Sequence, residues 1–249
     1  MTINVLVTAG GTTEKIDNVR GITNFSTGTL GSLIADAFAS QDAVDVDYVH
    51  GLGSKMPVSD TIVATQIESV DDLLRVIKEK LTSKTYDVVV HAMAVSDYYL
   101  VGSIGEQELT KQLFSDESSL DSVNFVDKLN ESFDKVQSVG KLGSDMSTLY
   151  MQLKETPKVI REIKKLQPTT KLVGFKLLVD VSEEKLVSVA ESLMEKNDCD
   201  YVLANDKSLI KEGQHIGLLV SSDGNIQRFN TKESIAEGIA VELMKENRK

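Results

Sequence analysis

Hydrophobic and polar positions alternate along this chain in a rhythm that predicts strands separated by helices. Short apolar runs occur at 3–8, 46–49, 62–66, 87–91, 172–175 and 201–204. Apolar residues recur every three or four positions, as on the buried face of a helix, at 28–40, 69–83, 156–166, 183–196 and 232–246. We expect Thr156 to cap the third of these helices, with Pro157 at its first position, where proline is tolerated. Valine-rich strands that alternate with helices predict an α/β fold, a three-layer and mostly parallel sheet with helices on both faces.

Two segments depart from this rhythm. Residues 222–225 read Ser-Asp-Gly-Asn between apolar runs at 216–220 and 226–229, which predicts a late β-hairpin. Residues 98–140 form a long excursion, with eight acidic residues and two lysines between Glu106 and Asp134. We interpret this excursion as a lid-like or oligomer-contact insertion in a single domain covering 1–249, and a solvated insertion is the alternative.

Composition narrows the class of protein. The 249 residues are 41% hydrophobic and 26% charged, which is ordinary for a globular chain. The sequence shows no membrane span and no secretory signal, and its single cysteine, Cys199, fits a reducing cytosol. We therefore expect a cytoplasmic protein. The net charge of −11 argues against binding to nucleic acid, and three histidines without metal-ligand spacing give no zinc pattern.

The first strand leads directly into a candidate anion site. Gly10, Gly11 and Thr12 follow the strand at once, and Ser26-Thr27-Gly28 opens the next helix. Unpaired N–H groups and the positive end of the helix dipole lie at such a helix start, and glycines let a phosphate approach the backbone. We therefore expect a phosphorylated ligand. Because the chain is acidic, nearby cations, backbone N–H groups and a divalent metal must supply the attraction.

Ligands of an open parallel sheet bind beyond the carboxyl ends of its strands. Four strand ends carry polar residues or glycines here, after Val7, His91, Phe175 and Ala204. Although they are far apart in the sequence, we expect these four segments to lie side by side.

Several of these segments resemble the phosphopantothenate–cysteine ligase family of coenzyme A synthesis. The stretches TAGGT (8–12), IDNVR (16–20) and TNFSTG (23–28) are similar to its N-terminal signature. The stretches AMAVSDY (92–98), GF (174–175) and AND (204–206) are similar to its later strand ends. The resemblance covers nearly the whole chain and fails mainly in 98–140. It implies a Rossmann-like fold and a homodimer.

The resemblance also implies a reaction. A nucleoside triphosphate, CTP or ATP, activates the carboxylate of 4′-phosphopantothenate as an acyl-nucleotidylate and releases pyrophosphate. The amine of free L-cysteine then attacks the acyl carbon and releases the nucleoside monophosphate. Both nucleophiles come from substrates, so the protein supplies alignment and positive potential. We expect Mg²⁺ to bridge the phosphates, held mostly by substrate oxygens.

Three residues are expected to carry the catalysis. By the resemblance, Asn24 lies closest to the activated acyl group and donates to its oxyanion, and the alternative is a turn residue. Arg20 binds phosphate or carboxylate through its fork, against the alternative of a surface ion pair. Lys141 neutralises the triphosphate, against the alternative of a solvated loop lysine.

Other residues are expected to bind the ligands. Asp97 contacts the sugar or base, and Phe175 lies near the base unless it is only a core aromatic. Asn205 and Asp206 bind substrate or metal, unless they only make a turn. The complete nucleotide set is Gly10, Gly11, Thr12, Ser26, Thr27, Gly28, Ala94, Asp97, Phe175 and Lys176. Ser26 and Thr27 can also be a simple helix cap. We interpret His50, His91 and His215 as structural, and Cys199, among acids, as a poor nucleophile.

Two departures from the family pattern leave the choice of nucleotide open. Lys141 retains only the first lysine of the lysine-rich segment of many bacterial members, and Lys176 stands where many of them have alanine.

Two other functions compete with the ligase. Tyr150 and Lys154 match the spacing of the short-chain NAD(P)-dependent reductases, but the alternation at 149–153 predicts a strand rather than the helix that this pair requires. The second alternative is a non-catalytic nucleotide-binding module that partners a separate decarboxylase. Because the chain begins almost directly at the ligase signature, we expect a monofunctional ligase.

Overall fold

The computed structural model describes residues 2–114, 123–134 and 147–247, which form two compact units. The first unit consists of Met1–Thr12, Asn24–Val95 and Lys158–Lys249. The second consists of Thr13–Thr23 and Ser96–Pro157. Lys141 lies outside the three described ranges.

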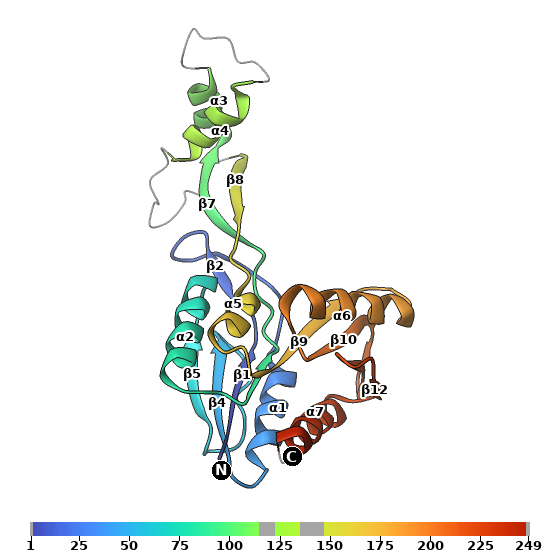
Figure 1. Cartoon of the computed structure of the whole chain (residues 1–249). Coiled ribbons are helices and arrows are strands. Elements are labelled where there is room, and N and C mark those ends of the chain that lie inside the picture. The colour runs from blue at the N-terminus through green and yellow to red at the C-terminus, as the bar shows by residue number, and fades with distance from the viewer. Residues whose placement is uncertain (1, 115–122, 135–146, 248–249) are drawn as a thin grey trace. The chain divides into compact units, whose positions relative to one another are not determined.

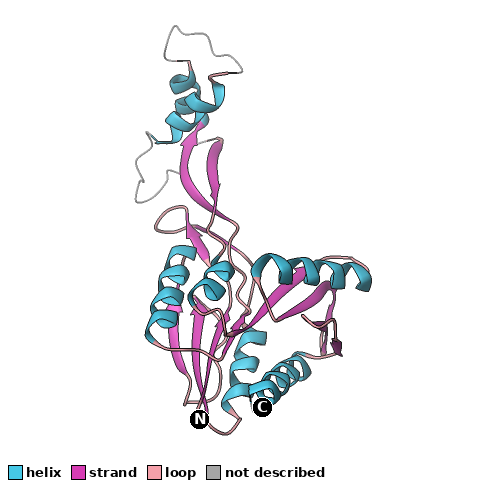
Figure 2. Cartoon of the chain, viewed as in Figure 1, coloured by secondary structure: helices cyan, strands magenta, loops and turns pink. Residues whose placement is uncertain are grey.

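The first unit is built on one sheet, in which eight strands are found among the described residues (Figures 1 and 2). Their order is β12-β11-β10-β9-β6-β1-β4-β5. The six strands from β10 to β5 run parallel to one another. Strand β11 runs antiparallel to β10, and β12 runs antiparallel to β11, which confirms a mostly parallel sheet with a late hairpin. The strands are β1 (Ile3–Ala9), β4 (Val44–Gly51), β5 (Val63–Ile67), β6 (Val88–His91), β9 (Lys171–Leu178), β10 (Tyr201–Lys211), β11 (Gln214–Ser221) and β12 (Ile226–Phe229).

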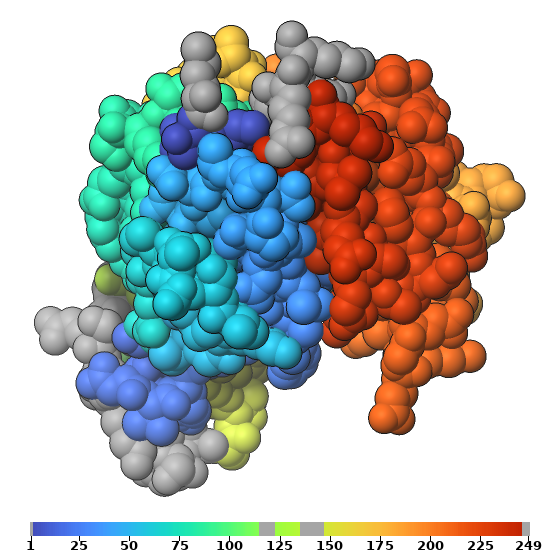
Figure 3. Space-filling model, turned by 90° about the horizontal axis from the view of Figure 1, so that it is seen from below, coloured from blue at the N-terminus to red at the C-terminus, as the bar shows by residue number. Residues whose placement is uncertain are grey.

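Helices cover both faces of this sheet, so the predicted three layers are confirmed. Helices α1 (Thr29–Ala39) and α7 (Lys232–Asn247) lie side by side on one face, as Figure 3 shows in blue and red. Helices α2 (Val70–Ser83), α5 (Val159–Leu166) and α6 (Glu183–Asn197) contribute to the core on the other face. Alternate residues of β1 serve the two cores, with Val5 and Val7 packed under α1 and Leu6 packed under α2.

The predicted start of α5 is wrong. Thr156 does not cap this helix, and Pro157 is not its first residue, because the helix begins at Val159 after Lys158. The backbone N–H of Thr156 donates to the carbonyl of Asp97, 2.9 Å away, and its hydroxyl donates to the carbonyl of Ser96. Thr156, one residue past the end of β8, is therefore still hydrogen-bonded to the segment that precedes β7. By contrast, Ser69 caps α2 through a reciprocal bond with Asp72, as a capping box does.

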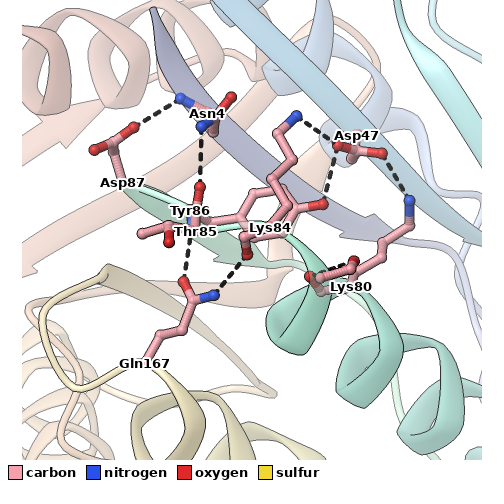
Figure 4. Close-up of polar contacts among 9 residues, drawn as sticks. Asn4, Asp47, Lys80, Lys84, Thr85, Tyr86, Asp87 and Gln167 are labelled. Carbon is pink, nitrogen blue, oxygen red and sulfur yellow. Dashed lines mark hydrogen bonds and ion pairs between the residues drawn. The ribbon is translucent and has the colours of Figure 1, made fainter.

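A buried carboxylate fastens α2 to the sheet (Figure 4). Asp47, on β4, accepts hydrogen bonds from Lys80 at 2.6 Å, Lys84 at 3.1 Å and the Tyr86 hydroxyl at 3.0 Å. Burial raises the pKa of Asp47, but the bonds from both lysines outweigh burial and hold it below its usual value. Gln167 completes the arrangement by accepting from the Tyr86 N–H and donating to the carbonyls of Leu81 and Lys84.

The second unit has its own small core. Strands β7 (Tyr98–Gly105) and β8 (Leu149–Glu155) form an antiparallel ribbon, and β2 (Thr13–Lys15) pairs with β3 (Gly21–Thr23). Helices α3 (Glu106–Leu113) and α4 (Phe125–Asp134) contribute Leu109 and Phe133, which form a small core with Ile104 of β7. Strands β2, β3 and β7 were not predicted from the sequence.

The strand at 149–153 is confirmed as β8. Tyr150 pairs with Ile104, and Lys154 pairs with Tyr99. Side chains four residues apart on a strand are too far apart for the contact that a helix makes at that spacing. The geometry on which the reductase interpretation depended is therefore missing.

Candidate active site

The four segments expected at the carboxyl edge of the sheet belong to adjacent strands, in the order β10-β9-β6-β1. Two of the predicted ends are wrong, however. Strand β9 continues past Phe175 to Leu178, and β10 continues past Ala204 to Lys211. Strand β9 stays paired with β10 past Phe175, so that Asn205 and Asp206 lie opposite Leu177 and Leu178 inside the sheet.

The ends of β1 and β6 are joined by backbone bonds. The N–H of Ala94 donates to the carbonyl of Gly10 at 2.8 Å, and the N–H of Thr12 donates to the carbonyl of Ala94 at 3.2 Å. Gly10 has a φ of 83°, a left-handed conformation that a side chain disfavours. Backbone hydrogen bonds thus connect Ala94 to the turn that the other predicted residues, Gly10, Gly11 and Thr12, form after β1.

Helix α1 begins beside this turn, and its N-cap residue offers no side chain to the first N–H groups, although the N–H of Thr29 donates a long bond of 3.5 Å to the Thr27 hydroxyl. Its N-cap is Gly28, also left-handed, and its first turn contains no acid. Ser26 and Thr27 are therefore not the N-cap residue. The first bond within the helix runs from Ser32 to Gly28, so the three N–H groups before Ser32 lie ahead of the hydrogen-bond ladder. These groups and the helix dipole favour an anion.

Sequence reasoning missed a further part of this site, the turn Gly51-Leu52-Gly53-Ser54-Lys55 at the end of β4. We name Gly10, Gly28, Gly51 and Ser54 the glycine cradle. A Cβ on Gly10 would lie 1.8 Å from the Ser54 Oγ, and one on Gly51 would lie 2.0 Å from the Gly11 carbonyl oxygen. A Cβ on Gly28 would lie 3.0 Å from the Ser54 Cβ. Gly51 and Gly53, close behind the predicted strand at 46–49, were the signal that could have found this turn.

Asn24 is anchored at the same edge. Its Nδ2 donates to the carbonyl of Val95 at 2.9 Å, next to Ala94. The side chain that the resemblance makes central is thus held against the end of β6, within the first unit.

Arg20 and Asp97 belong to the second unit. The Arg20 guanidinium binds the buried Asp17 carboxylate, with Nη2 at 2.7 Å and Nε at 3.1 Å. The other oxygen of Asp17 accepts the N–H groups of Val19 and Arg20. Asp97 is exposed, and its carbonyl holds Thr156.

The residues predicted on β9 and β10 are strongly tied into the fold. Phe175 is half-buried and packs against the core under α1 and α7, and Lys176 is half-buried beside it. The carboxylate of Asp206 accepts the N–H groups of Val181 at 2.7 Å, Asp180 at 3.0 Å and Ser208 at 2.7 Å. These bonds, that from Val181 first, lower the pKa of Asp206 to about 2.

All three histidines are buried and bonded, as expected. Burial lowers the pKa of His91 to about 4, and its Nδ1 lies 2.9 Å from the Thr8 hydroxyl, just before the turn at Gly10. His50 contacts the carbonyl of Gly51 at 3.1 Å. The His215 Nε2 lies 3.0 Å from the Asn205 amide. Burial first, and the charges of Asp200 and Asp198, raise the pKa of Cys199 to about 12, which agrees with an unreactive thiol.

No helix in the described part of the chain is long and apolar enough to cross a membrane. Among the residues that the structure describes, no group of three His, Cys, Asp or Glu side chains is placed to hold a metal ion.

Comparisons with known proteins show the family to which the chain belongs. The family model of the DNA/pantothenate metabolism flavoprotein C-terminal domain matches residues 1–132 and 132–246. A coenzyme A biosynthesis bifunctional protein CoaBC from Thermococcus kodakarensis is 32% identical over 243 residues. That match covers 97% of this chain and 51% of the relative, and the chain spans about half the length of the curated relatives it matches first.

Solved structures give the same result. The DNA/pantothenate metabolism flavoprotein of Streptococcus pneumoniae superposes with a TM-score of 0.84 at 34% identity, covering 98% of this chain and all of that one. A complex of a Cab2 variant with phosphopantothenate-cysteine has a TM-score of 0.65, covering 99% of this chain and 89% of that one; its 17% identity shows the fold alone. The motif resemblance is thereby confirmed, and the chain belongs to the family of the DNA/pantothenate metabolism flavoprotein C-terminal domain.

Proposed function

We propose that this protein is a phosphopantothenate–cysteine ligase, which forms an amide between 4′-phosphopantothenate and L-cysteine through an acyl-nucleotidylate. One observation carries the proposal. The glycine turn after β1, the start of α1 at Gly28 and the anchored Asn24 all lie within hydrogen-bonded segments at one edge of the sheet. Relatives named for coenzyme A biosynthesis support this choice of substrates.

This reaction needs the two substrates to be aligned and needs no nucleophile from the protein, because both nucleophiles belong to substrates. A carboxylate oxygen of phosphopantothenate attacks the α-phosphorus of the nucleotide, and pyrophosphate leaves. The cysteine amine then attacks the acyl carbon, a proton leaves the nitrogen, and the nucleoside monophosphate departs. Backbone N–H groups at the start of α1 and at the glycine turn would hold the phosphates in line without reorganisation during the reaction.

Asn24 is proposed as the donor to the acyl oxygen. Its bond to the Val95 carbonyl fixes the direction of the carboxamide. A fixed donor stabilises a developing oxyanion more than a mobile one, because it costs no reordering in the transition state.

The remaining assignments are proposals of the same kind. Arg20, Lys141 and Asp97 would contact phosphate or nucleoside groups, and Phe175 and Lys176 would lie near the base. Asn205 and Asp206 would contact substrate, Asp206 while its carboxylate accepts the N–H groups of Asp180, Val181 and Ser208. CTP or ATP serves as co-substrate, with Mg²⁺ held mostly by phosphate and water oxygens.

We further propose a homodimer and a separate phosphopantothenoylcysteine decarboxylase as partner. β12 is the outermost strand of the sheet, with Ile226 exposed, so it offers an edge for pairing with a second copy. A monomeric mass by light scattering would reject the dimer.

The direct test is the release of pyrophosphate. Purified protein is incubated with 4′-phosphopantothenate, L-cysteine, Mg²⁺ and each of the four nucleoside triphosphates in turn. We expect release that requires phosphopantothenate, with CTP or ATP preferred, and a loss of turnover in Asn24→Ala. Nucleotide binding without any release would instead identify the non-catalytic module.

A further inference from the structure

The loop at the end of β4 places an uncommitted lysine at the anion site. Lys55 is exposed and makes no ion pair with any described residue. Its backbone, however, is held on both sides. Its N–H donates to the carbonyl of Thr27 at 2.9 Å, and its carbonyl accepts the Tyr48 hydroxyl at 2.7 Å.

These bonds fix where the side chain starts. Thr27 directly precedes Gly28, the N-cap of α1, so the Lys55 backbone is bonded to the segment that opens this helix. Its neighbour Ser54 is in contact with Gly10 and Gly28 in the glycine cradle. A flexible side chain of four methylenes that starts here can reach an anion bound at the first N–H groups of α1.

A second observation points to a missing polar partner at the same place. The Ser54 Oγ is buried and has no hydrogen-bond partner among the described residues. It occupies the side of Gly10 where a side chain would otherwise lie. A buried hydroxyl without a partner is costly, and it commonly marks a bound water or ligand.

The charge of the protein makes a local cation necessary. The chain carries −11, so the field of the whole molecule opposes the approach of a triphosphate or a phosphomonoester. The N–H groups of α1 supply only partial positive charge. In the described part of the first unit, Lys55 adds a full charge beside them.

We infer that Lys55 is a phosphate-binding residue and that the Gly51–Lys55 turn forms one wall of the anion site. The inference rests on the proposed function, because that function brings two phosphorylated substrates to this edge. The shared chemistry is a phosphate group, from the nucleoside triphosphate or from 4′-phosphopantothenate.

Lys55→Met tests the inference, because methionine keeps the apolar stem and removes the charge. The backbone bonds of residue 55 do not depend on its side chain, so we expect the variant to fold normally. Lys185→Met, at an exposed position on α6, is the matched control, and Lys55→Arg keeps the charge. Binding of CTP and of ATP is measured by calorimetry at fixed ionic strength, and KM is measured for each substrate.

We expect Lys55→Met to weaken one phosphate-bearing substrate by roughly 10- to 100-fold, the usual range for a charge-assisted hydrogen bond. Lys55→Arg should retain most of the affinity, and Lys185→Met should match the wild type. A rise in the dissociation constant for nucleotide assigns the contact to the triphosphate. A rise in KM for phosphopantothenate alone assigns it to the phosphomonoester.

The outcomes separate the two claims. If the wild type binds and turns over its substrates while Lys55→Met behaves like Lys185→Met, the role of Lys55 is refuted and the proposed function stands. If the wild type binds neither nucleotide nor phosphopantothenate, the proposed function fails, and the role of Lys55 fails with it.

Discussion

Replacing Gly10 by alanine tests whether the glycine cradle is as tightly packed as its geometry indicates. Two costs add. A left-handed φ costs an L-residue about 1–2 kcal/mol, and forcing a methyl group into occupied space costs about 1–3 kcal/mol. The new Cβ would lie 1.8 Å from the Ser54 Oγ and 2.9 Å from the Ser54 Cβ, so the second cost is unavoidable unless Ser54 moves. We expect Gly10→Ala to lower the free energy of unfolding by roughly 2–5 kcal/mol.

Gly53→Ala is the matched control, because Gly53 has a φ of 72° but a Cβ there would meet nothing within 4 Å. It should therefore cost only the conformational part, about 1–2 kcal/mol. In the double variant Gly10→Ala/Ser54→Gly the clashing side chain is gone, so the cycle should show a coupling of at least about 1 kcal/mol. Urea unfolding followed by circular dichroism measures the wild type, Gly10→Ala, Ser54→Gly, the double variant and the control Gly53→Ala. Equal losses in Gly10→Ala and Gly53→Ala, with no coupling to Ser54, would refute the packing argument.

Three further predictions follow from the bonds of individual residues. Asn24→Ala should lower kcat by roughly 10²- to 10³-fold, as the loss of an oxyanion donor does. Because Asn24 is exposed, its replacement should change the unfolding free energy by no more than about 0.5 kcal/mol. Unchanged turnover would contradict the role given to this amide. His91 has a folded-state pKa of about 4 against 6.5 for the free group, so the unfolded chain takes up a proton first as pH falls. The free energy of unfolding should therefore drop by about 3 kcal/mol between pH 6.5 and 4. The same pH slope in His91→Gln would disprove this. Asp206 has a folded-state pKa of about 2 against 3.8 for the free group, so its contribution to the free energy of unfolding is present above pH 3.8 and lost as pH falls towards 2. Acid unfolding curves should therefore differ between wild type and Asp206→Asn. Coinciding curves would contradict the lowered pKa.

The layers of the first unit could be predicted because each strand and helix carries its own burial pattern. Val5, Leu6 and Val7 are buried towards both faces, and the stripe of α1 meets that of α7 over the same sheet. The meeting of Gly10 and Ala94 followed from topology, since parallel neighbours end at one edge, whereas the bond of Asn24 to Val95 did not.

Other features depend on contacts that a local pattern does not contain. Strands β9 and β10 run past Phe175 and Ala204 because each continues to pair with the other, and the N–H of Thr156 donates to the carbonyl of Asp97 rather than opening α5. The pair β2 and β3 contains charged and polar residues without alternation, so only its partner strand defines it. The turn at Gly51 was missed because β4 extends beyond the apolar run at 46–49.

The most direct test of the account is a crystal structure with CTP or ATP bound in the presence of Mg²⁺. We expect the phosphates to lie over Gly10 and Gly11, within hydrogen-bond distance of the first N–H groups of α1. A nucleotide bound with its phosphates away from that helix start would contradict the central claim, as would an empty edge at concentrations that support turnover.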